Sequence, residues 1–180
     1  MKTLIGLITT NNVRKEGFYH KKGGKGLIKV VEGDLLHQEV EVIVNAWNRN
    51  FIPYWMLLPH GVSRAIKQKA GTKPFKEVQK HGFLGLGEAI LTSAGKLSYK
   101  GIIHVAGIGV FWNSSEKAIR LSVQNAMKIV NEQGFTSVAF PLIGCGAGKF
   151  EEDRAIAIMK EELNKISFQA EVVLVKYSNQ

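Results

Sequence analysis

The segment at residues 40–46, VEVIVNA, constrains the fold more than any other part of this chain. It is a nearly continuous run of β-branched residues. Such a run is typical of a strand that is buried on both faces of a parallel or mixed sheet. We therefore expect a central sheet that has a covering layer on each face.

Helix-like and strand-like segments alternate along almost the whole sequence. Apolar residues at helical spacing predict helices at 61–71, 73–82, 114–134 and 150–166. Glycine ends the first two, proline opens the second, serine can cap the third, and acidic residues including Glu152 stand in the first turn of the fourth, where the helix dipole favours them. Short apolar runs predict further strands at 26–34, 87–95, 101–110, 136–144 and 170–177. This alternation predicts an α/β protein, a three-layer α/β/α sandwich with a mixed central sheet.

The length of 180 residues favours one domain, and we expect it to span residues 1–180. The predicted elements place its core at residues 27–177. Residues 1–26 form an extension, which we predict to be a strand at 1–10 followed by a polar loop, rich in glycine and lysine, at 11–26.

Cysteine content and hydropathy indicate the class of protein. The single cysteine, Cys145, excludes a disulfide framework and a cysteine-based zinc site within one chain. No apolar run reaches the roughly 18 residues that a membrane span requires. The first ten residues lack a convincing signal-peptide cleavage site. We therefore expect a cytoplasmic protein that does not bind a membrane.

The chain is basic, with a formal net charge of +9 and a pI near 9.7. This charge suits a polyanionic partner such as nucleic acid or a phosphorylated ligand. It also suits a well-solvated, lysine-rich surface, because the lysines are scattered along the sequence. The densest group is Lys21, Lys22 and Lys25. Both interpretations stay open at this point.

Three predicted strand ends carry unusual residues, and open α/β sheets bind ligands beyond the carboxyl ends of their strands. Asp34 follows a glycine, and by itself it is typical of a cap for the next turn. Asn45 continues a buried strand, where its amide must be satisfied. The glycine-rich turn at 144–148 could present backbone N–H groups to an anion. It is not a Walker loop, because Phe150 stands where Ser or Thr is required.

Four motifs in order resemble the macro domain family. They are VVEGDLLHQEVEVIVNAWN at 30–48, GVSRAI at 61–66, GEAILTSAGKLSYKGIIHVAG at 87–107 and FPLIGCGAGKF at 140–150. The resemblance covers residues 27–176. It implies the macro domain fold and binding of ADP-ribose, and some members of the family hydrolyse ADP-ribosyl linkages.

The resemblance also implies a set of ligand-binding residues: Asp34, Leu35, Asn45, Ala46, Asn48, Gly61, Val62, Ser63, Gly144, Cys145, Gly146, Ala147, Gly148 and Phe150. In this reading Asp34 accepts a hydrogen bond from the adenine amino group, and Leu35 donates its backbone N–H. Asn48 contacts the distal ribose, and Phe150 lies near it.

The remaining ligand-binding residues belong to two phosphate loops in the same reading. Gly61 and Val62 end the first loop. Residues 144–148 form the second, whose backbone amides cradle the diphosphate. Neither a metal nor a cofactor is implied.

The first phosphate loop departs from the family pattern. Its usual glycines are replaced by a longer apolar segment, NFIPYWMLLPHG at 50–61, which contains two prolines. A group of side chains this apolar is expected to be covered. Residues 51–60 could form a lid over the cleft, pack on the core of the chain, or form the contact of a homodimer. The chain is accordingly expected to be a monomer or a homodimer.

The residues available for catalysis also depart from the pattern. Ser63 occupies the position where many family hydrolases have an aspartate, and a serine cannot act as a carboxylate base. His60 is a possible substitute base, because its unperturbed pKa of about 6.5 suits proton transfer. Hydrolysis would use water, with Asn48 orienting the distal ribose. The candidate catalytic residues are therefore Asn48, His60 and Ser63.

Three functions remain open. The chain could bind ADP-ribose or a related nucleotide and hydrolyse an ADP-ribosyl bond or a terminal phosphate, as in ADP-ribose-1"-phosphate processing. It could be a catalytically silent reader of ADP-ribosylated protein or nucleic acid. It could also be a basic nucleic-acid binder, although such a protein has no need of the carboxylate of Asp34.

Two further residues could carry chemistry. Cys145 could act as a nucleophile, or it could be a small residue that fills a tight turn. His104 lies within a predicted buried strand, where we expect a structural role.

Overall fold

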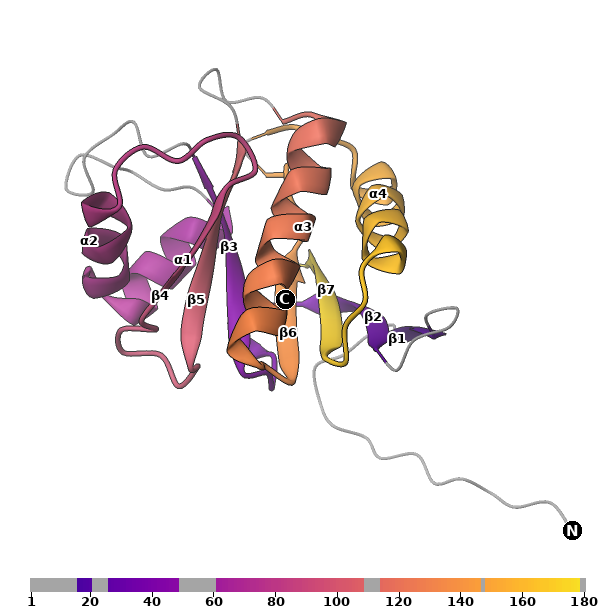
Figure 1. Ribbon diagram of the computed structural model, residues 1–180, viewed down its shortest axis with the longest axis horizontal. Coiled ribbons are helices and arrows are strands. Elements are labelled where there is room, and N and C mark those ends of the chain that lie inside the picture. Colours follow the sequence, from indigo (N-terminus) through magenta and orange to yellow (C-terminus); the bar gives the residue numbers. More distant parts are fainter. Residues whose placement is uncertain (1–15, 21–25, 49–60, 109–113, 147, 179–180) are drawn as a thin grey trace, which may run out of the picture.

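The computed structural model describes residues 16–20, 26–48, 61–108, 114–146 and 148–178. Within these residues the chain forms a seven-stranded sheet with the order β1-β2-β7-β6-β3-β5-β4 (Figure 1). The neighbours β1–β2 and β4–β5 are antiparallel, and the other neighbours are parallel, so the sheet is mixed. The strands are β1 Glu16–His20, β2 Leu27–Gly33, β3 Val42–Asn48, β4 Ala89–Thr92, β5 Gly101–Ile108, β6 Ser137–Pro141 and β7 Glu171–Tyr177.

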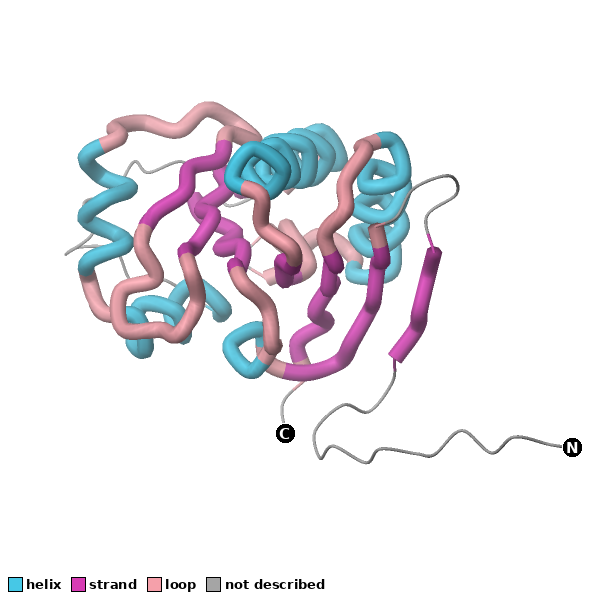
Figure 2. Tube along the Cα trace, turned by 60° about the horizontal axis from the view of Figure 1, so that its bottom comes forward, coloured by secondary structure: helices cyan, strands magenta, loops and turns pink. Residues whose placement is uncertain are grey.

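In the described part of the chain, four α-helices cover the two faces of this sheet (Figures 1 and 2). They are α1 Gly61–Ala70, α2 Lys73–Lys80, α3 Glu116–Gln133 and α4 Glu152–Lys165. Helices α1 and α2 form one layer with one hydrophobic core cluster, and α3 and α4 form the other layer with a second cluster. The predicted three-layer α/β/α sandwich with a mixed sheet is confirmed.

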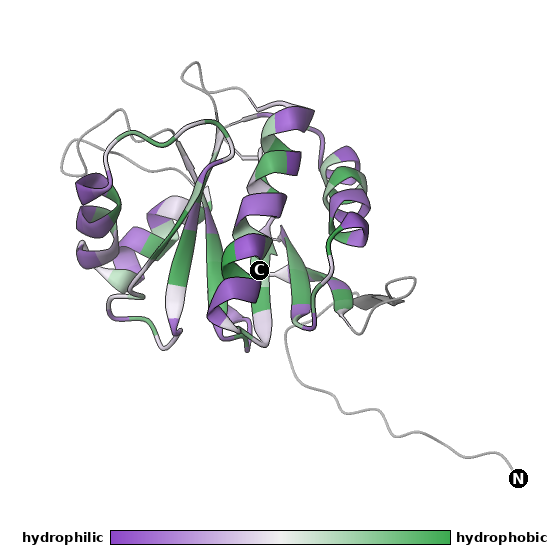
Figure 3. Cartoon of the chain, viewed as in Figure 1, coloured by the Kyte–Doolittle hydropathy of each residue, from purple (hydrophilic) through white to green (hydrophobic). Residues whose placement is uncertain are grey.

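Strand β3 shows why the two faces separate. Val42 and Val44 pack in the core cluster under α3 and α4, whereas Ile43 packs in the cluster under α1 and α2. All three side chains are fully buried, because successive side chains of a strand point to opposite faces. The prediction that residues 40–46 contain a strand buried on both faces is therefore confirmed. Figure 3 shows the matching pattern, with green apolar strands between helices that are purple on their outer sides.

Helix α3 begins and ends as its sequence predicts. The hydroxyl of Ser115 accepts a hydrogen bond from the backbone N–H of Ala118, which satisfies one of the free N–H groups of the first turn. Gly134 ends the helix in the left-handed conformation, with φ of 67°. The expected apolar stripe is fully buried: Ile119, Val123, Met127 and Val130.

The N-terminal extension differs from its prediction. We expected a loop over residues 11–26, but residues 16–20 form β1, which pairs antiparallel with β2. The segment contains Phe18 and Tyr19, and aromatic residues favour strands, so an open sheet edge outweighs the surrounding glycines and lysines. The strand predicted at residues 1–10 lies outside the described residues.

The parallel strands set the place of the functional site. Strands β2, β7, β6 and β3 run parallel and neighbour one another, so their carboxyl ends lie at the same edge of the sheet. Gly33, Pro141, Tyr177 and Asn48 are the last residues of these strands. Among the described residues, no helix is long and apolar enough to cross a membrane.

Candidate functional site

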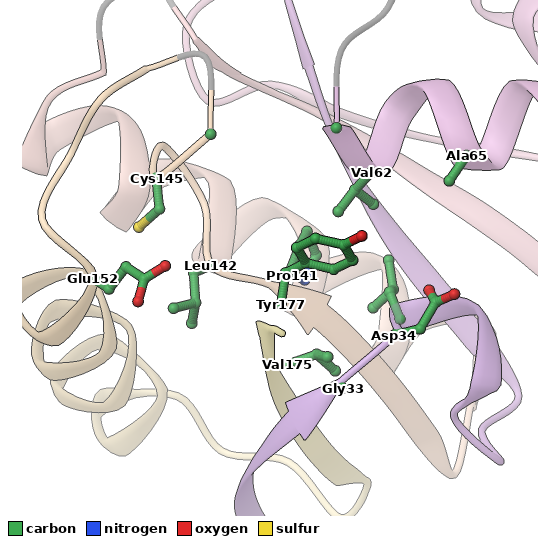
Figure 4. A pocket seen from close by; sticks show the side chains of 13 residues that line it. Gly33, Asp34, Val62, Ala65, Pro141, Leu142, Cys145, Glu152, Val175 and Tyr177 are labelled. Atoms are coloured by element: carbon green, nitrogen blue, oxygen red, sulfur yellow. The ribbon is translucent and has the colours of Figure 1, made fainter. Parts of the chain in front are cut away.

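A cavity of about 320 Å³ opens at this carboxyl edge (Figure 4). It lies between the end of β2, the start of α1, the loop after β6, the start of α4 and the end of β7. Its volume suits a small-molecule ligand. The described residues that line it are Gly33, Asp34, Leu35, Gly61, Val62, Ala65, Pro141, Leu142, Cys145, Gly146, Glu152, Val175 and Tyr177.

Asp34 stands at one end of this cavity and caps a short 3-10 turn, Leu35–His37. Its Oδ1 accepts a hydrogen bond of 2.9 Å from the backbone N–H of Leu36, so the capping role predicted from sequence is confirmed. An ionised carboxylate has about four acceptor positions, so this cap leaves capacity for a donor on a ligand.

Neighbouring residues hold this turn in place. The side-chain amide of Gln38 donates to the backbone carbonyl of Asp34 at 2.9 Å. The hydroxyl of Tyr99 lies 3.3 Å from the carbonyl oxygens of Leu35 and Gln38, to which it can donate. Burial, and then the nearby charge of Asp34, raise the pKa of Tyr99 to about 12, so the phenol stays a donor at neutral pH. These hydrogen bonds hold the backbone of the turn, and thereby the position of Asp34 at the cavity.

The first turn of α1 forms a second wall of the cavity. Gly61 begins the helix in the left-handed region, with φ of 55°, and a side chain there would be strained. Gly61, Val62 and Ala65 line the cavity, and no acidic residue lies in this first turn. The backbone N–H groups at a helix N-terminus favour an anion, so this wall suits a phosphate. Ser63 is not among the lining residues, and its hydroxyl is buried without a hydrogen-bond partner.

The loop after β6 forms the third wall and is closed by its own hydrogen bonds. The N–H of Phe150 donates to the carbonyl of Gly144 at 3.0 Å, and the N–H of Lys149 donates to that of Gly146 at 3.1 Å. A Cβ atom at Gly144 would lie 2.5 Å from the hydroxyl oxygen of Ser114, and one at Gly148 would lie 2.5 Å from the carbonyl oxygen of Gly144. Both positions therefore require glycine, Gly148 for packing within the loop and Gly144 for packing of the loop against Ser114.

The predicted members of this loop divide into two groups. Cys145 and Gly146 line the cavity, whereas Gly144, Gly148 and Phe150 do not. Phe150 is half-buried and packs against the core cluster under α3 and α4. Ala147 lies outside the described residues.

Cys145 does not have the environment of a nucleophile. Burial, and then the charges of Glu152 and Glu151, raise the pKa of its thiol to about 11. Thiolate is the reactive form of cysteine, so this residue is unreactive at neutral pH. The geometry favours the alternative reading, in which Cys145 is a small residue that fills the turn.

The residues predicted on β3 are divided as well. Asn45 is fully buried and does not line the cavity, contrary to its expected place in the site. Its side-chain amide lies 3.0 Å from Nδ1 of His104, because side chains of this register point under the α1–α2 layer. Ala46 is half-buried and is not a lining residue. The side chain of Asn48, and all of His60 and the 51–60 segment, lie outside the described residues.

His104 continues this buried chain of polar groups. Burial lowers its pKa to about 3, so the ring is neutral. The side-chain amide of Asn45 donates a hydrogen bond to Nδ1, so the ring proton lies on Nε2. The Nε2–H group then donates to the hydroxyl of Thr92 at 3.0 Å. His104 also makes edge contacts with Trp47 and Phe75, at centroid distances of 5.9 and 5.6 Å. The structural role expected for His104 is supported.

Sequence reasoning missed seven lining residues: Gly33, Ala65, Pro141, Leu142, Glu152, Val175 and Tyr177. Tyr177 is an exposed aromatic whose ring lies beside Pro141 (Figure 4). It ends β7, and applying the strand-end argument to the last predicted strand would have found it. Glu152 was interpreted only as an acidic residue in a helix first turn; it faces the cavity and forms an ion pair of 2.9 Å with Lys176.

Comparisons with known proteins agree with this geometry. A family model described as Macro domain matches residues 44–159. A macro domain-containing protein of Listeria monocytogenes is 37% identical over 139 residues, which are 73% of this chain and 75% of that protein. A solved structure titled as the Oceanobacillus iheyensis macrodomain with ADP matches with a TM-score of 0.78 at 26% identity, over 92% of this chain and 90% of that chain.

A mutant of the same Oceanobacillus iheyensis macrodomain, solved with ADPR, matches with a TM-score of 0.79 at 26% identity, over 92% of this chain and 91% of that chain. The family model covers more than half of this chain. The chain therefore belongs to the macro domain family.

Proposed function

We propose that this chain binds ADP-ribose, free or attached to a macromolecule, in the cavity at the carboxyl edge of its sheet. One observation carries the proposal: the Asp34 carboxylate and the N-terminus of α1 line the same cavity. A carboxylate recognises an amino group, and a helix N-terminus recognises a phosphate. A ligand with an amino group at one end and a diphosphate in its middle satisfies both, and the ADPR bound to the Oceanobacillus iheyensis macrodomain is such a ligand.

The residue roles follow from this ligand. Asp34 accepts a hydrogen bond from the adenine amino group, and Leu35 donates its backbone N–H to the same ring. The diphosphate lies between Gly61–Val62 and Cys145–Gly146, all of which line the cavity.

The distal ribose extends past the diphosphate toward Asn48. Residues 27–177 form the binding unit as one domain. A cytoplasmic location is supported by the presence of a single cysteine.

A catalytically silent reader is the second candidate function, and two observations favour it over a hydrolase. Ser63 stands where a carboxylate base is expected, and its hydroxyl is buried away from the cavity lining. The raised pKa of Cys145 removes a thiolate nucleophile. If the chain does hydrolyse an ADP-ribosyl bond, water is the nucleophile, with Asn48 orienting the ribose and His60 as the base.

Calorimetric titration with ADP-ribose tests the binding function. Asp34→Ala is expected to weaken binding roughly ten- to a hundredfold, because an adenine amino group loses a charged acceptor worth about 1.5–3 kcal/mol. Asp153→Ala is the matched control, because Asp153 is an exposed acid on α4 that does not line the cavity. Thermal unfolding of both variants checks that the fold survives the loss of the cap.

Two outcomes contradict the proposal. A wild-type protein that does not bind ADP-ribose contradicts the function itself. Wild-type affinity in Asp34→Ala contradicts the orientation of the ligand. Release of ADP-ribose from modified protein or nucleic acid by the wild type then distinguishes the hydrolase from the reader.

A further inference from the structure

The α1–α2 layer carries an excess of positive charge. Residues 61–82, all within the described part of the chain, hold six basic residues and one acidic residue, Glu77. The six basic residues define the α1–α2 basic face: Arg64, Lys67, Lys69, Lys73, Lys76 and Lys80. Glu77 offsets part of this charge: its carboxylate accepts hydrogen bonds from the N–H and hydroxyl of Ser93, at 2.7 and 2.8 Å, and it also interacts with the charges of Lys73 and Lys80.

The α3–α4 layer provides an internal comparison. Its two helices hold the same number of basic residues, but six acidic residues accompany them: Glu116, Glu132, Glu152, Asp153, Glu161 and Glu162. Arg120 alone pairs with Glu116, Glu161 and Glu162 at 2.7 to 3.0 Å. This layer is therefore neutral, whereas residues 61–82 have a formal charge of +5. The two helical layers therefore differ in net charge, although they hold equal numbers of basic residues.

The chemistry of the α1–α2 basic face identifies its kind of partner. The apolar side chains of these helices, Ile66, Ala70, Phe75 and Val78, are buried in the core. A membrane-surface helix needs such an apolar face free for lipid, so a membrane is a poor partner. Phe83, directly after α2, is 55% exposed. Cations that neutralise phosphates, together with an exposed aromatic residue close to them in the sequence, are the features of a single-strand binding surface.

We propose that the α1–α2 basic face binds single-stranded nucleic acid through its phosphates. The two helices are about 15 and 12 Å long at 1.5 Å per residue, which accommodates several phosphates of one strand. Helix α1 begins at the cavity. The helix leads away to α2 (Figure 1), so the proposed strand would lie beside the cavity without filling it. The surface is a separate site, and it does not depend on ADP-ribose binding.

Fluorescence anisotropy of a short, labelled single-stranded RNA of mixed sequence tests this surface. The triple variant Lys69→Glu/Lys73→Glu/Lys80→Glu is expected to bind at least about tenfold more weakly. The slope of the logarithm of the binding constant against the logarithm of the salt concentration should become shallower by about two, because each lost phosphate contact accounts for roughly 0.7. Phe83→Ala is expected to weaken binding by about fivefold or more with an unchanged slope, because a stacking contact carries no charge.

The other layer supplies the matched control, Lys117→Glu/Lys128→Glu/Arg154→Glu. Both triple variants lower the formal net charge of +9 by the same amount, so an effect of total charge alone is equal in the two. The proposal expects the control to bind RNA within about threefold of the wild type, because distant charges are screened. Thermal unfolding verifies that all variants are folded.

Three outcomes overturn the proposal. The first is that the wild type does not bind RNA, and the second is that the two triple variants lose equal RNA affinity. The third is that polyglutamate competes as strongly as unlabelled RNA of equal charge, which would identify an acidic protein as the partner. Titration with free ADP-ribose is run in parallel and separates the two proposals. A wild type that binds RNA but not ADP-ribose refutes the proposed function and supports the basic face.

Discussion

The two helical layers differ in how completely their polar groups are satisfied. In the α3–α4 layer, charges are paired across helices, and Glu162 has a side chain that is only 4% exposed yet contacts Arg120, Gln124 and Lys165. Under the α1–α2 layer, Asn45 Oδ1, Trp47 Nε1 and the Ser63 hydroxyl are buried without a hydrogen-bond partner. These are three of the four such atoms among the described residues.

This difference indicates that one layer serves binding and the other serves stability. Buried polar groups without partners lower stability, and natural folds retain them mainly at functional sites. The α1–α2 layer contains them, borders the cavity and carries the excess positive charge. The α3–α4 layer is neutral and paired, which suits a role in holding the sheet. Substitutions in the two layers should therefore separate stability from binding.

A pair of core truncations should have the largest effect. Phe75→Ala and Met127→Ala each remove a fully buried side chain from one layer, and each should lower the free energy of unfolding by about 3–5 kcal/mol. Only Phe75→Ala should also weaken ADP-ribose binding, because Phe75 contacts Trp47 near the end of β3, at a centroid distance of 5.2 Å.

Urea unfolding and titration at a temperature where both variants are folded check this pair. Equal losses of affinity in Phe75→Ala and Met127→Ala would remove the distinction between the layers.

The sequence predicted the layers better than it predicted the cavity. Apolar periodicity along helices, and β-branched runs in strands, depend on neighbours close in sequence, so α3 and β3 were recognised correctly. The excess charge of residues 61–82 was missed, because the basic residues were considered only as a total and at Lys21, Lys22 and Lys25. Strand β1 was missed, because pairing to β2 stabilises it more than its own composition does.

The site shows the same limit. Asp34 and residues 144–148 were predicted for the site because each stands at the end of a predicted strand, whereas Gly61 and Val62 were predicted from the resemblance to macro domains. Asn45 was expected in the site, but the register of β3 with β5 turns it toward His104. Glu152 and Tyr177 come to the cavity from elements whose sequence signals were entirely structural.

Low pH should destabilise the fold through His104, which is buried under the α1–α2 layer. Its folded pKa of about 3 lies below the ordinary value of 6.5, so the unfolded chain binds one more proton between these values. The stability that neutral His104 provides is therefore complete above pH 6.5 and is lost as the pH falls toward 3. We expect His104→Gln to remove up to about 5 kcal/mol of this pH dependence, at roughly 1.4 kcal/mol per pKa unit.

Urea unfolding as a function of pH measures this contribution. His81→Gln is the matched control, because His81 is exposed after α2. If His104→Gln and the wild type lose stability in parallel between pH 6.5 and 3, burial of a neutral ring is not the source of the acid sensitivity.

Glu162→Gln should have a moderate effect confined to stability. Partial burial raises the pKa of Glu162, but hydrogen bonds from Gln124, Arg120 and Lys165 outweigh this and keep its pKa below the usual range. The variant removes this charge while Arg120 keeps two acidic partners, so we expect a loss of about 1–2 kcal/mol. ADP-ribose affinity should not change.

The exposed pair Lys128–Glu132, with 3.8 Å between its charged atoms, provides the control for this prediction. Glu132→Gln should lower the free energy of unfolding by less than about 0.5 kcal/mol, because exposed pairs are screened by water. Comparable effects of the two variants in thermal unfolding would show that the α3–α4 charges are ordinary surface pairs.

Tyr99→Phe should have the smallest effect on stability and a disproportionate one on binding. It removes the hydroxyl next to the carbonyls of Leu35 and Gln38, so the free energy of unfolding should fall by about 0.5–1.5 kcal/mol. The same hydroxyl supports the turn that positions Asp34, so ADP-ribose affinity should fall severalfold while RNA binding stays unchanged. Ser98→Ala, at the exposed neighbouring residue, should alter neither. An unchanged ADP-ribose affinity in Tyr99→Phe would mean that the Asp34 carboxylate is held by its own cap to Leu36, and that support from behind the turn contributes only to folding.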